Sequence, residues 1–229
     1  MTDALERVRG GLVVSVQAVA GSPLAAPEHL AAIARAAELG GAVGIRTEGL
    51  AAVTAIREAV DVPVIGLVKR RVSGSEVYIT PELEDGLAVA EAGGDLVAVD
   101  ATERARPDGS SGAEFVAALA AELPGRIVAD VDRLSAGAAA ARAGAAAVAT
   151  TLSGYTSATS STAPDIPLVT QLAQEVSVPV LAEGRYASPE SVSEAFAAGA
   201  FAVVVGTAIT DPGALTRRLA AATPRGADG

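Results

Sequence analysis

The stretch Ala198-Gly-Ala-Phe-Ala-Val-Val-Val-Gly206 stops a helical pattern at a glycine and then enters an apolar run. Glycine is favoured just beyond the last helical residue, and a continuous run of branched apolar residues is typical of a strand covered on both faces. Similar glycine junctions recur at residues 39–41, 92–94 and 143–144. The sequence therefore predicts a repeated helix-to-strand unit.

Eight such apolar runs are predicted as strands, at residues 11–17, 42–47, 62–69, 95–100, 126–130, 146–150, 178–183 and 201–206. Helical spacing of apolar residues lies between them, at residues 28–39, 81–92, 110–123, 135–143 and 189–198. No G-x-G-x-x-G follows the first run, so a closed barrel is favoured over an open doubly wound sheet. We expect an α/β protein with a single (β/α)8 TIM barrel domain over residues 1–229.

Composition excludes several classes of function. Half of the 229 residues are hydrophobic, so the chain buries a substantial core. A net charge of -10 and only 3% aromatic residues argue against a nucleic-acid partner. The absence of cysteine and the single histidine exclude disulfides, thiolate zinc sites and multi-histidine cages, so we expect no metal and no cofactor.

No segment of the sequence is predicted to lie in a membrane. The longest uncharged stretch, residues 143–164, is rich in serine and threonine, which a spanning helix in a bilayer would not tolerate. Asp3, Glu6 and Gln17 argue against a secretory signal in the first twenty residues, and we expect a cytoplasmic protein. Residues 153–164 are instead predicted as a long loop that carries function.

Polar residues recur where the predicted strands end. In such barrels the active site lies at the C-terminal ends of the strands, so these residues are predicted to line a polar cavity. They are Gln17, Arg46, Glu48, Lys69, Arg70, Asp100, Asp130, Asp132, Thr151, Ser153, Glu183, Arg185, Gly206 and Thr207.

Lys69 is the only lysine of the chain, whose other basic residues are all arginine. The pKa of a lysine falls from about 10.4 toward 7–8 when burial and neighbouring cations disfavour its charge, which makes it a usable base or Schiff-base amine. Arg46, Arg70 and Arg71 are the predicted cations. The alternative is an ordinary surface lysine.

Glu183 ends the seventh predicted strand, where a carboxyl group can exchange protons with a sugar oxygen. The alternative is an ion pair with Arg185. Barrels also hold phosphate on the loops after strands seven and eight, and Gly184-Arg185 and Gly206-Thr207 lie there. We expect backbone N–H groups at the glycines and a bidentate clamp by Arg185.

Six motifs resemble the N-acetylmannosamine-6-phosphate 2-epimerase family of bacterial sialic acid catabolism. The resemblance covers residues 11–210, and its strings are G-L-V-V-S-V-Q (11–17), A-V-G-I-R-T-E-G (42–49), V-I-G-L-V-K-R (64–70), T-T-L-S-G-Y-T (150–156), A-E-G-R-Y (182–186) and V-G-T-A-I-T (205–210). It implies a (β/α)8 barrel, a homodimer and a cofactor-independent proton transfer at C2 of an N-acetylated sugar phosphate.

The resemblance also implies roles for individual residues. Lys69 corresponds to the catalytic lysine and Glu183 to the partner acid. Gln17, Arg46 and Asp130 correspond to polar residues around the reacting sugar, and Ser153 is grouped with them as substrate-binding. Gly184, Arg185, Gly206 and Thr207 match the phosphate end.

The sequence departs from the family's expected pattern at three loops. Ala101 and Glu103 stand where a glycine and an aspartate are expected, Asp132 follows a less familiar loop, and no proline follows Gln17. These loops lie near the predicted pocket, so they affect substrate preference more than reaction type.

Two other functions are compatible with the same residues. A strand-end lysine also suits a Schiff-base phosphosugar aldolase, which borohydride trapping would detect as an adduct on Lys69. A barrel that binds the sugar phosphate without turnover is the second alternative.

Overall fold

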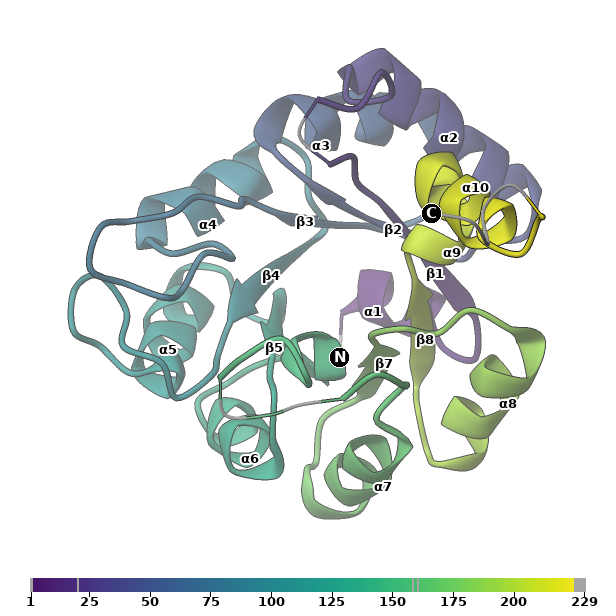
Figure 1. Ribbon diagram of the computed structural model, residues 1–229. Coiled ribbons are helices and arrows are strands. Elements are labelled where there is room, and N and C mark those ends of the chain that lie inside the picture. The colour runs from purple at the N-terminus through teal and green to yellow at the C-terminus, as the bar shows by residue number, and fades with distance from the viewer. Residues whose placement is uncertain (1, 20, 158, 160, 225–229) are drawn as a thin grey trace.

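Eight parallel strands close into a barrel, in which each strand pairs with the next and β8 pairs with β1 (Figure 1). The computed structural model describes residues 2–19, 21–157, 159 and 161–224. The strands are β1 (Leu12–Val16), β2 (Gly44–Glu48), β3 (Val64–Leu67), β4 (Leu96–Asp100), β5 (Ile127–Asp130), β6 (Ala147–Ala149), β7 (Val180–Glu183) and β8 (Ala202–Val205). The predicted (β/α)8 fold is confirmed.

Helices α2 to α8 form an outer ring around the strands, whereas α1 precedes β1 and lies near the barrel axis (Figure 1). The helices are α1 (Asp3–Arg7), α2 (Pro27–Leu39), α3 (Leu50–Ala59), α4 (Leu83–Glu91), α5 (Gly112–Glu122), α6 (Leu134–Arg142), α7 (Ile166–Glu175), α8 (Pro189–Ala197), α9 (Thr207–Thr210) and α10 (Pro212–Ala220), with a 3-10 turn, η1 (Thr150–Leu152). Each predicted strand agrees with an observed one to within two residues at either end. The five predicted helices correspond to α2, α4, α5, α6 and α8.

Strand β4 shows why the apolar runs are continuous. Leu96 and Ala98 belong to the core inside the barrel, whereas Val97 and Val99 belong to the core between the sheet and the helices. All four side chains are fully buried. Because both faces of a parallel strand are covered, neither face needs polar residues.

Small residues let the helices pack closely against the sheet. A Cβ atom on Gly66 in β3 would lie 2.5 Å from Val89 Cγ1 and 3.0 Å from Val53 Cγ2, so only glycine fits there. Inside the barrel, Leu5 and Val8 from the N-terminal segment are fully buried in the same core as the strand residues. α1 therefore closes the end of the barrel opposite the C-terminal ends of the strands.

The connection after β3 turns back as a hairpin instead of leading straight into a helix. The N–H of Arg70 donates to the carbonyl of Tyr78 at 2.9 Å, and the N–H of Thr80 donates to the carbonyl of Val68 at 2.7 Å. Ile79 is thereby buried in the barrel core. The hairpin fixes the backbone on either side of Lys69, which forms an antiparallel bridge with Ile79.

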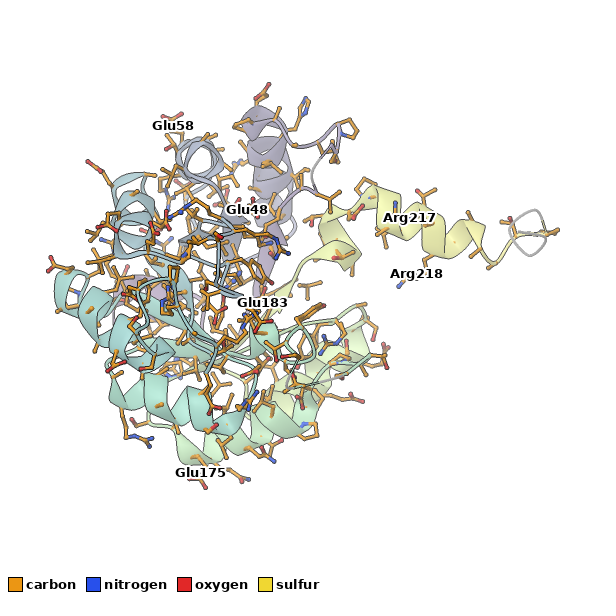
Figure 2. All side chains as sticks on the ribbon, turned by 60° about the vertical axis from the view of Figure 1, so that its left-hand side comes forward. Glu48, Glu58, Glu175, Glu183, Arg217 and Arg218 are labelled. Atoms are coloured by element: carbon orange, nitrogen blue, oxygen red, sulfur yellow. The ribbon has the colours of Figure 1, made fainter. Side chains whose placement is uncertain are left out.

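The segment after β6 is the predicted long loop. It runs from η1 to the start of α7 at Ile166, and its positions 158 and 160 lie outside the described residues. At the C-terminal end, α10 projects away from the barrel, and none of its residues is buried (Figure 2). Across the described part of the chain, no helix combines the length and apolar character needed to cross a membrane.

Candidate active site

A pocket of about 910 Å³ opens at the C-terminal ends of the strands. Its walls come from the ends of β1, β2, β7 and β8, the hairpin after β3, and helices α9 and α10. Eight of the ten residues that were assigned site roles line it: Gln17, Arg46, Lys69, Glu183, Gly184, Arg185, Gly206 and Thr207. A cavity of this size is typical of a small-molecule site.

Arg46 and Asp130 form a buried bidentate ion pair. Nη1 of Arg46 donates to Oδ1 of Asp130 at 3.1 Å, and Nη2 donates to Oδ2 at 2.6 Å. The two side chains are 2% and 0% exposed. Burial would lower the pKa of Arg46, but the charges of Asp130 and Glu183 raise it above its ordinary value. Arg46 is therefore a fixed cation, and Asp130, which does not line the pocket, acts on its contents through Arg46.

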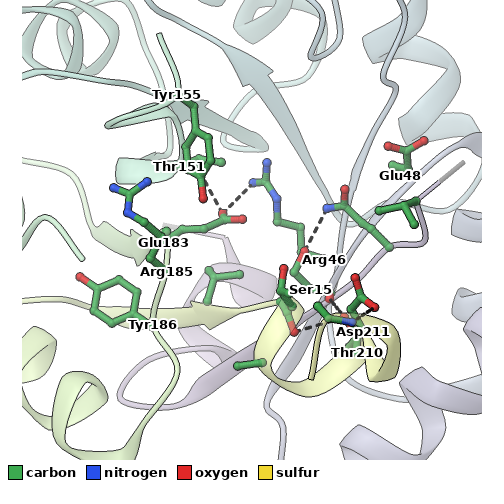
Figure 3. A pocket seen from close by; sticks show the side chains of 18 of the residues that line it. Ser15, Arg46, Glu48, Thr151, Tyr155, Glu183, Arg185, Tyr186, Thr210 and Asp211 are labelled. Carbon is green, nitrogen blue, oxygen red and sulfur yellow. Dashed lines mark hydrogen bonds and ion pairs between the residues drawn. The ribbon is translucent and has the colours of Figure 1, made fainter. Parts of the chain in front are cut away.

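Glu183 lies beside this pair and is 14% exposed. Its Oε2 is 3.4 Å from Nη1 of Arg46 and accepts a hydrogen bond from Thr151 Oγ1 at 2.9 Å (Figure 3). Burial raises the pKa of Glu183, the charge of Arg46 opposes the rise, and the charge of Asp130 adds to it. Glu183 is therefore a carboxyl group that holds its proton to higher pH than an ordinary glutamate.

Lys69 lies at the rim of the pocket, with a side chain that is 38% exposed. Its Nζ donates to Oε1 of Gln17 at 2.5 Å and lies 3.4 Å from Oε2 of Glu48. Nε2 of Gln17 donates to Ser15 Oγ at 2.9 Å. The amide oxygen of Gln17 therefore faces the lysine, because its nitrogen is already bound to the serine.

The structure differs from the predicted surroundings of Lys69, which were three arginines. Arg46 is paired with Asp130, and Arg70 is paired with Glu82 at 2.7 Å and Asp85 at 2.8 Å. The guanidinium of Arg71 lies over the ring of Tyr78. The charged partner of Lys69 is instead the carboxylate of Glu48, because β2 ends beside the hairpin that carries the lysine.

The predicted phosphate residues gather at the pocket between β7 and α9. Gly184 has a φ of 118°, a conformation that favours glycine, and the backbone of Gly206 passes so close to Ser15 that a Cβ would lie 3.3 Å from it. The first N–H groups of α9, beginning at Thr207, have no acceptor within their own helix. They are available to an anion in the pocket.

Arg185 differs from the predicted bidentate clamp. Its Nε donates to the carbonyl of Ala163 and its Nη2 to the carbonyl of Ser153, both at 2.8 Å, so it joins the two ends of the loop after β6. Tyr155 lies under the guanidinium, 4.8 Å from ring centre to Cζ. Among the described residues, Nη1 is buried without a hydrogen-bond partner.

Ser153, a predicted site residue, points away from the pocket and toward Asp165. Its hydroxyl donates to Asp165 Oδ2 at 2.5 Å, and the residue is 1% exposed and absent from the pocket wall. Asp165 in turn accepts from the N–H of Leu168 at the start of α7. The geometry thus gives Ser153 a place in holding the loop and Arg185, and no contact with the pocket.

The motifs gave no role to several other residues of the pocket wall, although Glu48 and Thr151 were predicted to line it. Tyr78 and Arg218 carry no local signal, because the first enters through the hairpin after β3 and the second from the projecting α10. Within the ranges that the structure describes, no three histidine, cysteine, aspartate or glutamate side chains are grouped to hold a metal ion.

Comparison with known proteins gives a consistent result. The model of a family described as "Putative N-acetylmannosamine-6-phosphate epimerase" matches residues 30–225. A curated relative from Caldanaerobacter subterraneus subsp. tengcongensis, described as a "Putative N-acetylmannosamine-6-phosphate 2-epimerase", is 44% identical over 218 residues and covers 94% of this chain and 92% of the relative. A relative from Thermosynechococcus vestitus with the same description is 49% identical over 205 residues and covers 89% of each chain.

A solved structure is similar as well. The N-acetylmannosamine-6-phosphate 2-epimerase from Clostridium perfringens superposes with a TM-score of 0.89 at 38% identity and covers 94% of both chains. The similarity therefore extends over nearly the whole of both chains.

Proposed function

The chain belongs to the N-acetylmannosamine-6-phosphate epimerase family, and from this premise we propose that Lys69 and Glu183 move the proton at C2 of the sugar. The enzyme is an isomerase that interconverts N-acetylmannosamine 6-phosphate and N-acetylglucosamine 6-phosphate, which differ in configuration at C2. One observation carries the assignment of residues: an amine and a carboxyl group with a raised pKa line one pocket. General acid–base catalysis requires such groups near the reacting atom.

The open-chain sugar has an acidic hydrogen at C2, next to the C1 aldehyde. Lys69 takes this proton, the C2–H bond breaks, and its electron pair passes into an enolate with negative charge on O1. Arg46, a fixed cation at the pocket wall, stabilises that charge. A proton returned to the opposite face of C2 inverts its configuration, and Glu183 assists ring opening or carries protons.

The far end of the sugar carries the phosphate. Gly184, Gly206 and Thr207 offer backbone N–H groups, and Arg185, which also lines the pocket, adds a positive charge. Binding at this end positions C2 near Lys69 and does not itself take part in proton transfer. Gln17 reaches the sugar at the same rim as the lysine.

Replacement of Lys69 by methionine tests the assignment. In deuterated water, the native protein is expected to convert either epimer and to introduce deuterium at C2, as followed by NMR. Lys69→Met is expected to lower both rates at least 100-fold, because a general base typically contributes about 10²–10⁴. Affinity for the phosphorylated sugar should remain, and exchange at the native rate would remove Lys69 from the mechanism.

Two results would replace the epimerase reaction with another function. Borohydride in the presence of substrate would trap a Schiff base on Lys69, and carbon–carbon cleavage with such an adduct would identify an aldolase. Binding of both epimers without conversion of either would identify a non-catalytic sugar-phosphate protein.

We propose that the protein is a homodimer that uses the surface of α10. The helix projects from the barrel and has no buried residue, and Leu219 on it is 66% exposed (Figure 2). Ile209, just before α10, is 44% exposed. Burial of such exposed apolar side chains would stabilise a contact between two subunits.

We further propose that residues 1–229 form one domain and that the enzyme acts in the cytoplasm. A closed barrel shares one sheet among all its units, so heat or denaturant should unfold it in one cooperative transition by circular dichroism and by tyrosine fluorescence. A charged sugar phosphate does not cross a bilayer unaided, so enzyme and substrate are expected in the soluble fraction of the cell.

A further inference from the structure

Strand β2 presents two charged side chains to the pocket, Arg46 and Glu48. They are two residues apart, and residues at this spacing share one face of a strand. The side chain of Arg46 is 2% exposed and that of Glu48 is 34% exposed, so Glu48 lies nearer to the solvent. Figure 3 shows Glu48 and Glu183 on opposite sides of Arg46. One strand thus supports a buried charge cluster and a second charged group at the rim.

Lys69 is the partner of that second group. Its Nζ lies 3.4 Å from Oε2 of Glu48 and donates to Oε1 of Gln17 at 2.5 Å. The amide of Gln17 has a fixed orientation, because its Nε2 donates to Ser15 Oγ at 2.9 Å. A lysine side chain has a flexible four-carbon stem, so an ammonium group without partners would sample many positions. Two acceptors from two strands restrict it to one position.

The other carboxylates near the pocket are already engaged. Glu183 is bound by Thr151 and lies beside Arg46, and Asp130 holds both terminal nitrogens of Arg46. An exposed ion pair such as Glu48–Lys69 adds little to folding stability. The ion pair therefore matters mainly because it sets the position and the charge of the Lys69 amine.

We propose that Glu48 is a positioning residue that holds the amine of Lys69 over C2 of the sugar and stabilises the ammonium that forms there. The inference rests on the proposed role of Lys69. When the C2–H bond breaks, the proton forms a new N–H bond at Nζ, and the electron pair remains with the enolate. Positive charge thus develops on Nζ beside the carboxylate of Glu48, which favours the transition state.

Glu48→Gln tests the proposal, because glutamine keeps the size of the side chain and removes its charge. The kcat should fall about 10- to 100-fold, since misplacement of a catalytic group costs about that much. KM should stay within about twofold of the native value, because the phosphate end is not altered. Glu48→Asp should recover part of the lost kcat. Glu58→Gln, on the outer surface of α3, is the matched control and should leave kcat and KM unchanged (Figure 2).

The single lysine makes the contact directly observable. Protein labelled with ¹⁵N at the lysine Nζ should give one lysine side-chain signal, from Lys69. Glu48→Gln should shift this signal and speed the exchange of its protons with water, and Glu58→Gln should not. The signal reports whether the contact between Glu48 and Lys69 is present, and the fall in kcat at an unchanged KM reports its effect on catalysis.

The outcomes separate this inference from the proposed function. If Lys69→Met is inactive but Glu48→Gln has native kcat, or leaves the Nζ signal unchanged, the role of Glu48 is refuted and that of Lys69 stands. If Lys69→Met still exchanges the C2 hydrogen at the native rate, the catalytic role of Lys69 is refuted and the role of Glu48 falls with it.

Discussion

Two neighbouring threonines bind Glu183 in different ways. Oγ1 of Thr151 donates to the side-chain oxygen Oε2 at 2.9 Å and lies 2.7 Å from Asp130 Oδ1. Oγ1 of Thr150 instead donates to the backbone carbonyl of Glu183 at 2.8 Å and accepts from its N–H at 3.0 Å. Thr151 therefore acts on the charge of the glutamate, whereas Thr150 acts on the end of its strand.

Thr151→Val should move the limb of the kcat/KM profile that Glu183 causes to higher pH. Burial raises the pKa of Glu183 above its ordinary value of 4.5, and the hydrogen bond from Thr151 counteracts the rise by stabilising the ionised form. Without that bond the pKa rises further, so less Glu183 is ionised at a given pH on the limb. Measurement of kcat/KM from acid to neutral pH checks the prediction.

Thr150→Val is the matched control for this experiment. It removes the two contacts to the backbone of Glu183 and leaves the side-chain bond in place, so it should lower the melting temperature without moving the limb. A limb at the native pH in Thr151→Val, or an equal shift in both variants, would contradict the assignment of Glu183 as the group that titrates.

At the scale of elements, helix starts are defined by side chains that cap them. Ser188 accepts from the N–H of Ser191 at the start of α8, and Asp211 accepts from the N–H of Ala214 at the start of α10. Each of the two caps precedes a proline in the first turn, a position that proline favours. The start of α5 has a different, steric requirement. Its first residue, Gly112, lies so close to the backbone of Ala101 and Thr102 that a side chain would not fit.

Gly112→Ala should destabilise the protein by about 1–3 kcal/mol, the usual cost of overpacking. The new Cβ would lie 2.6 Å from the carbonyl carbon of Ala101 and 2.7 Å from the oxygen of Thr102, and backbone atoms of a buried strand end cannot move aside. The free energy of unfolding in urea, native against variant, measures the effect.

Gly213→Ala is the control, because its Cβ would meet Oδ1 of Asp211 at 3.2 Å on the exposed α10. It should cost less than about 0.5 kcal/mol. If both variants lose the same stability, the close contact between the start of α5 and the end of β4 is not the reason that glycine is needed at position 112.

At the scale of the whole molecule, α10 stands apart, because it projects from the barrel and none of its residues is buried. Leu219→Glu should shift the proposed homodimer toward monomer, because a charge on α10 would have to lose its water in a dimer contact. A loss of affinity of at least tenfold is expected, as a single interface side chain often contributes about 1–2 kcal/mol or more. Sedimentation equilibrium of native and variant protein measures it.

Leu39→Glu serves as the control. Leu39 is 73% exposed at the end of α2, and Leu219 is 66% exposed, so the two substitutions change the surface equally. The control should leave the association unchanged. A monomeric native protein, or a dimer that both variants disturb alike, would refute the use of α10.

The sequence by itself determined the barrel, because the signals that define its helices and strands are local. Glycines that stop helices, capping serines and aspartates, and continuous apolar runs act over a few residues, and each one predicts an element by itself. The position of Lys69 and Glu183 at strand ends followed from the same pattern, since a parallel barrel brings all its C-terminal strand ends to one face.

Only the tertiary structure decided which charges meet. Arg46 and Asp130 pair across 84 residues of sequence, Lys69 faces Glu48 and Gln17 instead of the predicted arginines, and Ser153 turns toward Asp165. An ion pair depends on the direction of two side chains after the barrel has closed and the loops have folded back. That information is spread over the whole chain, so no local pattern contains it.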